Sequence, residues 1–142
     1  MTESTGRAAW VTAAVLTGRL IFTAMFLFAV SLKVMDVGAT ADQIAEAGFP
    51  MSRVLVWFAI LAEAALVLCF ATGAYFREAA LFAAVYVVFL AFSFHGASHW
   101  ITNQDEFGFF VDHFTFAAGL LFASAHGPGH RLAWKRSFFD RA

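Results

Sequence analysis

The chain has 142 residues, of which 61% are hydrophobic and 13% are charged, and its formal net charge is −1. A soluble domain has about 45–50% apolar and about 25% charged residues, so this composition excludes an ordinary water-soluble fold. With no basic patch interleaved with aromatic residues, the sequence also gives no indication of a nucleic-acid partner.

Four apolar stretches have the length of about 20 residues that a membrane-spanning helix needs. In chain order, the predicted helices cover about 10–33, 54–74, 78–100 and 107–126. These runs are long and unbroken, whereas strands of a membrane barrel alternate over roughly ten residues. The sequence therefore predicts an all-α integral membrane protein, with residues 1–142 forming a single four-helix bundle in the lipid bilayer.

The longest connection, between the first and second predicted helices, contains a short amphipathic stretch. Asp42 to Ala47 are expected to form a helical turn before the breaker Gly48-Phe49-Pro50. The single cysteine, Cys69, lies in an apolar run and has no partner for an internal disulfide. We interpret it as a small hydrophobic residue of the second membrane helix.

The distribution of lysine and arginine predicts the orientation. In a four-span protein the N-terminus, the short second connection and the C-terminal tail lie on the same side of the membrane, and these segments carry most of the lysine and arginine residues. The connections on the other side carry only Lys33 and Arg53. The positive-inside rule then places both termini in the cytoplasm, and in a bacterium the membrane is the inner one. The cationic residues of the first side are Arg7, Arg77, Arg131, Lys135, Arg136 and Arg141.

Ionisable residues within membrane helices are costly and normally face the bundle interior, so they are the candidate ligand residues. Two groups follow from their depth along the helices. One contains Arg19 and Glu63, which we expect to pair; Asp112 is the alternative partner of Arg19. The pair is either a structural tie between two helices or the lining of a ligand or proton site. The full set is Arg19, Lys33, Glu63, His95, His99, Asp112 and His113.

The second group lies toward the opposite membrane face. His95 and His99 are spaced i, i+4 and are expected to share one helix face, which Asp112 or His113 would join. Imidazoles and a carboxylate are acceptable ligands for zinc, iron or copper, and two histidines can hold a haem. The other interpretation is polar groups that satisfy one another at the membrane edge. No metal or haem signature is present, so the sequence names no metal ligands.

A heptad spacing relates Arg19, Phe26 and Lys33, which predicts one stripe along the first helix. This stripe either lines the interior of the bundle, or Phe26 is simply core and Lys33 extends toward the headgroups.

Several short motifs, in a fixed order, resemble the DoxX family of small four-helix bacterial membrane proteins. Between Arg19 and Trp134 the chain has Arg19, Lys33, Gly48-Phe49-Pro50, Glu63, Gly73-x-Tyr75-x-Arg77-x-Ala79-Ala80, His95 and Gly127-Pro128-Gly129. One departure is Asp112-His113, where the family usually has Lys-Asn or a similar polar pair. The resemblance therefore does not transfer a ligand role to this position.

The resemblance implies a membrane subunit or partner of a redox assembly, linked to a quinone or to thiols. Some relatives are the membrane subunit of thiosulfate:quinone oxidoreductase, and others act in thiol-redox assemblies. The chain has no cysteine pair, dinucleotide motif or haem attachment motif, so it is not expected to be an enzyme by itself. A quinone fits this interpretation; a haem or metal at His95, His99 and His113 is the alternative cofactor.

Two other functions remain open at this point. The chain is short enough to be a structural or assembly subunit without chemistry, in which the charged residues specify helix packing or an oligomer. It is also compatible with a small transporter or proton pathway, although broken helices and paired repeats are not evident.

Overall fold

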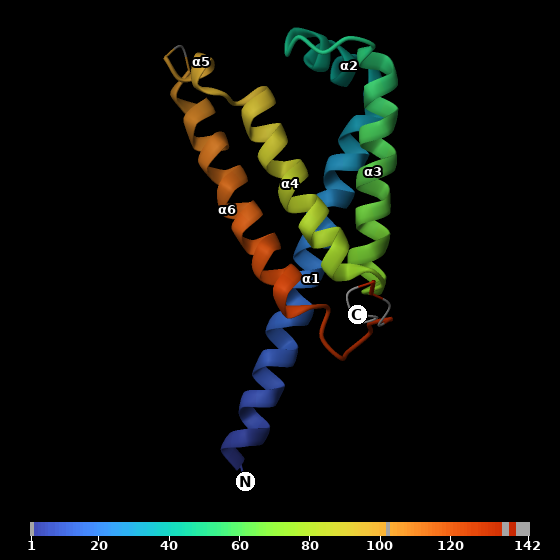
Figure 1. Cartoon of the computed structure of the whole chain (residues 1–142), viewed down its shortest axis with the longest axis vertical. Coiled ribbons are helices and arrows are strands. Elements are labelled where there is room, and N and C mark those ends of the chain that lie inside the picture. Colours follow the sequence, from blue (N-terminus) through green and yellow to red (C-terminus); the bar gives the residue numbers. More distant parts are fainter. Residues whose placement is uncertain (1, 102, 135–136, 139–142) are drawn as a thin grey trace. The chain divides into compact units, whose positions relative to one another are not determined.

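The computed structural model describes residues 2–101, 103–134 and 137–138, and for residues 2–8 it describes the main chain only. These residues form helices and connecting segments, and no strand occurs among them (Figure 1). The elements in chain order are α1 (Thr2–Met35), α2 (Val37–Glu46), α3 (Ser52–Thr72), α4 (Phe76–Phe94), α5 (Ala97–Trp100) and α6 (Gln104–His126).

Four of these helices are long and apolar enough to cross a membrane, which confirms the predicted all-α fold class with four spans. They are the part of α1 from Ala9 to Met35, and the whole of α3, α4 and α6. Their outward surfaces carry many large apolar side chains; Phe122 of α6 is 79% exposed and Leu68 of α3 is 66% exposed. Such surfaces are unstable in water and are matched by lipid.

The helix boundaries differ from the expected ones at three places. α1 begins at Thr2, eight residues before the expected start, while α4 ends at Phe94, six residues before the expected end at 100. The predicted amphipathic turn is a full helix, α2, which starts earlier because the Asp36 carboxylate accepts a hydrogen bond from the amide of Ala39 (2.8 Å). Aspartate is a favourable residue at this capping position.

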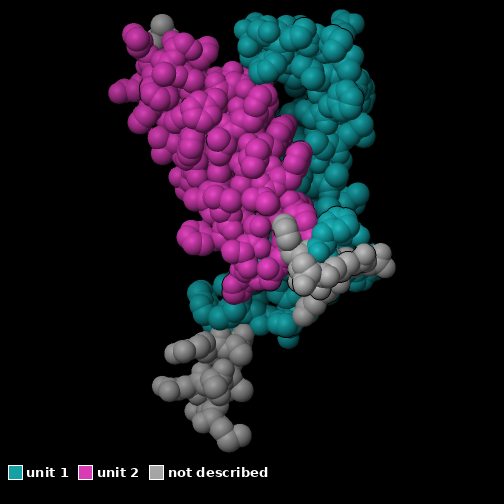
Figure 2. All heavy atoms as spheres, in the orientation of Figure 1, with its two compact units in different colours: residues 1–76, 127–142 teal, residues 77–126 magenta. Residues whose placement is uncertain are grey.

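The chain divides into two compact units (Figure 2), which are described separately. Unit 1 comprises residues 1–76 and 127–142, and therefore contains α1, α2, α3 and the C-terminal segment. Unit 2 comprises residues 77–126, with nearly all of α4, and α5 and α6.

The core of unit 1 is an aromatic cluster between α1 and α3. Phe70 of α3 is fully buried, and its ring centroid lies 5.7 Å from that of Phe22 and 5.6 Å from that of Phe26, both in α1. Phe76 meets the same ring edge-on, with the centroids 5.5 Å apart. At these separations aromatic pairs contribute about 0.5–1.5 kcal/mol each beyond the burial of area. The cluster therefore holds the middle of α1 against the C-terminal end of α3.

Gly73 allows the C-terminal segment to approach the end of α3. It ends α3 in the left-handed conformation, with φ +74°, and its amide donates to the carbonyl of Cys69 (2.8 Å). A Cβ atom at this position would lie 2.9 Å from Cβ of Ala133. The adjacent Thr72 carbonyl accepts the amide of Trp134 (2.8 Å), so the segment lies directly against the turn.

Replacing Gly73 with alanine is expected to lower the free energy of unfolding by about 1–3 kcal/mol, because the left-handed φ and the close contact are both unfavourable for a side chain. The matched control is Gly18→Ala in α1, where an added Cβ would meet nothing within 4 Å. Unfolding by SDS in mixed micelles, followed by circular dichroism, compares the two variants. Equal stability of both variants would contradict the role of Gly73.

Candidate functional site

A buried ion pair connects α1 and α3 within their membrane-spanning parts. Nζ of Lys33 lies 2.9 Å from Oε1 of Glu63, and the two side chains are 22% and 2% exposed. A carboxylate in such surroundings is unfavourable unless a partner neutralises it. Lys33 belongs to the last turn of α1, whereas Glu63 lies near the middle of α3. The pair places an acid and a base together inside unit 1.

The expected pairing of Arg19 with Glu63 is wrong, since the structure gives the guanidinium group of Arg19 main-chain carbonyls as partners. Its Nη1 donates to the carbonyls of Pro128 and Arg131, both at 3.2 Å. Its Nη2 donates to the carbonyls of Ala71 (3.2 Å) and Leu132 (2.6 Å). Arg19 is 2% exposed, so the four carbonyl dipoles replace water around a buried cation.

The difference follows from the register of two antiparallel helices. Lys33 is opposite Glu63, and Arg19 lies 14 residues earlier in α1, which is roughly 21 Å along the axis at about 1.5 Å per residue. Arg19 is therefore level with the end of α3, where Ala71 lies, and not with its middle. Counting from an expected helix start near residue 10 placed Arg19 too close to Glu63.

The predicted heptad stripe of α1 faces α3. Phe26 is 4% exposed and packs on Phe70, while Arg19 and Lys33 reach α3 below and above it. Within unit 1 the stripe therefore faces the neighbouring helix α3, and the lining of a four-helix bundle by this stripe stays a prediction.

The C-terminal segment is the part of the Arg19 contacts that sequence reasoning missed. Leu132, which gives the shortest of the four bonds, has φ +49°, a conformation that is unfavourable for a leucine. Gly129 has φ +78°, and a Cβ there would lie 3.0 Å from Cγ1 of Val15. The motif Gly127-Pro128-Gly129 indicated a turn but not its partner, because main-chain carbonyls leave no signal in the residue types.

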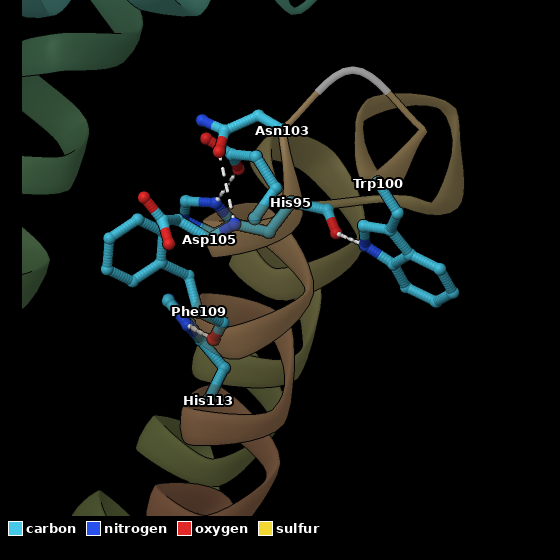
Figure 3. A network of polar contacts seen from close by, with 7 residues as sticks. His95, Trp100, Asn103, Asp105, Phe109 and His113 are labelled. Carbon is cyan, nitrogen blue, oxygen red and sulfur yellow. Dashed lines mark hydrogen bonds and ion pairs between the residues drawn. The ribbon is translucent and has the colours of Figure 1, made fainter.

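In unit 2 a second polar cluster forms where α4, α5 and α6 meet. Nδ1 of His95 lies 2.6 Å from Oε2 of Glu106, and the indole Nε1 of Trp100 donates to the carbonyl of His95 (2.8 Å). Nδ1 of His113 lies 2.7 Å from the carbonyl of Phe109, one turn earlier in α6. The ring centroids of His95 and His113 are 5.0 Å apart. Figure 3 shows these side chains around the start of α6.

The expectation that His95 and His99 share one helix face is wrong. α4 ends at Phe94, and Gly96 separates His95 from α5, in which the exposed His99 lies. A Cβ at Gly96 would lie 2.9 Å from the carbonyl of Phe92, so a glycine permits this break in the helix. His113 joins His95, as one of the two expectations had it, while Asp112 is exposed.

Within the described residues, no group of three or more His, Cys, Asp or Glu side chains is placed to hold a metal ion. Glu106 was not among the candidate residues predicted from the sequence, and the structure makes it the partner of His95. The sequence did contain a signal for this contact. Glu106 lies in the first turn of one membrane helix, and His95 directly follows the membrane helix before it.

These features define a class of protein: an all-helical membrane protein with four spans and with buried ionisable groups inside its first unit. The model of the DoxX family matches residues 14–96, which is more than half of the chain. The chain belongs to the DoxX family. The match ends at residue 96, so α6 and the C-terminal segment, which the motif resemblance included, lie outside it. Searches of curated proteins and of solved structures found no match.

Proposed function

We propose that this chain is the membrane subunit of a redox assembly, and that Lys33 and Glu63 bind the headgroup of a quinone. The observation that carries the proposal is the ion pair of 2.9 Å inside the membrane-spanning parts of α1 and α3. Reduction of a quinone to a quinol adds two electrons and two protons. In this proposal the ammonium group of Lys33 donates one proton to a quinone oxygen, and the carboxylate of Glu63 takes up protons from the aqueous phase and passes them to Lys33 and to the second quinone oxygen.

The chemistry of the two groups supports this assignment. An ammonium group has three donors, and the contact with Oε1 of Glu63 uses one of them. Lys33 is partly exposed while Glu63 is enclosed, so a ligand would approach from the side of Lys33. With Cys69 as its single cysteine the chain has no dithiol of its own. The electrons would come from a partner subunit.

The test compares the wild-type protein with Glu63→Gln, both tagged and purified in mild detergent from the native host. We expect the wild type to retain extractable quinone and a stoichiometric oxidoreductase subunit, identified by mass spectrometry. Glu63→Gln keeps the size and a hydrogen-bonding group, so it is expected to assemble but to lose quinone turnover. Arg53→Gln, a change at an exposed residue of the first turn of α3, is the matched control.

Two outcomes would contradict the proposal. Wild-type quinone turnover in Glu63→Gln would remove Glu63 from the site. A lone homo-oligomer without quinone would favour the structural subunit, an interpretation that the contacts of Arg19 with carbonyls already favour for that residue.

We also propose that both termini are cytoplasmic and that the membrane is the bacterial inner membrane. The support is the sequence distribution of lysine and arginine, of which Lys135, Arg136 and Arg141 lie outside the described residues. Fusing alkaline phosphatase or green fluorescent protein to the C-terminus is expected to give fluorescence and no phosphatase activity. The opposite pattern would invert the orientation.

A further inference from the structure

The two histidines of unit 2 each have Nδ1 within hydrogen-bonding distance of an acceptor oxygen. Nδ1 of His113 lies 2.7 Å from the carbonyl oxygen of Phe109, and a carbonyl only accepts, so this nitrogen carries the proton. Nδ1 of His95 faces the carboxylate of Glu106 at 2.6 Å, and an ionised carboxylate likewise only accepts. In the neutral rings, Nε2 is therefore the nitrogen with the lone pair in both cases.

This arrangement is the one that metal-binding histidines normally have. A ligating imidazole donates its other N–H to a carboxylate or a main-chain carbonyl, which fixes the ring and makes the ligating nitrogen more basic. His95 has the carboxylate form of this support and His113 the carbonyl form. The ring of Phe109 packs on that of His95, with the centroids 5.4 Å apart.

The separation of the rings fits one shared ion. Metal–nitrogen bonds of about 2.0 Å place a metal about 3.2 Å from an imidazole centre, so two bound rings have centres about 5.2 Å apart at a tetrahedral angle and about 5.5 Å apart at a trigonal one. The observed distance between the centroids is 5.0 Å, with the planes inclined at 46°. A linear arrangement would need about 6.4 Å. The geometry thus leaves at least one further position open.

We propose that His95 and His113 bind one Cu(I) ion through Nε2, with Glu106 as the positioning residue and an open position for an external ligand. Imidazole is a ligand that suits copper, and a singly charged ion is the one that a site with a single carboxylate neutralises. One positive charge next to the Glu106 carboxylate leaves the half-buried cluster neutral. This site is separate from Lys33 and Glu63 and does not depend on the quinone proposal.

The test titrates the purified full chain, in detergent micelles and under anaerobic reducing conditions, with Cu(I) in competition with the chromophoric chelator bicinchoninate. We expect one Cu(I) per wild-type chain, and X-ray absorption at the copper edge is expected to show imidazole ligands. His113→Ala and His95→Ala are expected to lose the site. Because the hydrogen bond of His113 is with a carbonyl of its own helix, His113→Ala keeps the test valid if His95→Ala fails to fold.

Two further variants distinguish Cu(I) binding at His95 and His113 from nonspecific Cu(I) binding to exposed histidines. Glu106→Gln is expected to weaken the Cu(I) affinity about 10- to 100-fold, the usual effect of losing the support of a ligating histidine. His126→Ala, an exposed histidine at the other end of α6, is expected to bind Cu(I) like the wild type. Equal affinity of His113→Ala and the wild type would overturn the proposal, as would binding of Zn²⁺ without binding of Cu(I).

Discussion

Replacing Arg19 with methionine is expected to release the C-terminal segment from unit 1 and to lower the free energy of unfolding by about 3 kcal/mol or more. The substitution keeps an apolar side chain of similar length but leaves four carbonyls without their donor. An unsatisfied buried polar group costs about 1–3 kcal/mol, and part of this cost is relieved when the segment moves away.

The local effect is measured at one amide. The N–H of Trp134 donates to the carbonyl of Thr72 (2.8 Å), so its hydrogen exchange is expected to accelerate strongly in Arg19→Met. In Arg19→Lys the exchange rate of this amide is expected to lie between those of the wild type and Arg19→Met. An ammonium group keeps the charge but lacks the planar guanidinium group that reaches several carbonyls. Arg53→Met, at an exposed arginine, is the control and should change stability by less than about 0.5 kcal/mol. Unchanged exchange of Trp134 in Arg19→Met would show that the segment is held by other contacts.

Removing one member of the Lys33–Glu63 pair is expected to destabilise the protein more than removing both. Lys33→Met removes the ammonium group from the enclosed carboxylate of Glu63, and breaking such a pair costs about 3–5 kcal/mol. Glu63→Leu should cost less, because Lys33 is partly exposed and can extend toward water. The double variant Lys33→Met with Glu63→Leu replaces both charges by apolar groups and is expected to recover most of the loss.

A double-mutant cycle on SDS unfolding measures this interaction. We expect a coupling free energy of up to about 3 kcal/mol, the upper range for residues in direct contact. The additive control is the pair Lys33 and Arg53, since both residues are cationic and Arg53 lies ten residues before Glu63 in α3, roughly 15 Å along the helix axis. Additive losses for Lys33 and Glu63 would mean that the ion pair contributes nothing to stability.

The sequence predicted the spans well because lipid imposes a single strong requirement on length and polarity. Four apolar runs, each closed by charged or turn-forming residues, corresponded to α1, α3, α4 and α6. The ends were less predictable. α4 was expected to continue to Trp100, but Gly96 permits the break and Trp100 bonds back to the carbonyl of His95. Composition alone does not reveal such a return contact.

The candidate residues were identified correctly as ionisable groups in membrane helices, but their partners were not. Glu63 and Lys33 were both selected, yet the register that pairs them depends on where α1 really begins. Arg19 was assigned a carboxylate because a charge suggests an opposite charge, whereas the protein surrounds it with carbonyls from a segment more than 100 residues away. Glu106 was overlooked for the same reason: partners are properties of the fold.

The polar contacts of Arg19 and Lys33 also limit how α1 moves. The aromatic contact of Phe26 with Phe70 holds the two helices at one level only, between the two polar contacts. The carbonyl contacts of Arg19 and the ion pair of Lys33, roughly 21 Å apart along α1, are satisfied in one vertical position only. A translation of α1 along its axis relative to α3 would break the Arg19 contacts and the Lys33–Glu63 ion pair at the same time. The two helices are therefore expected to behave as one rigid body, and any conformational change in unit 1 would have to move α1 and α3 together.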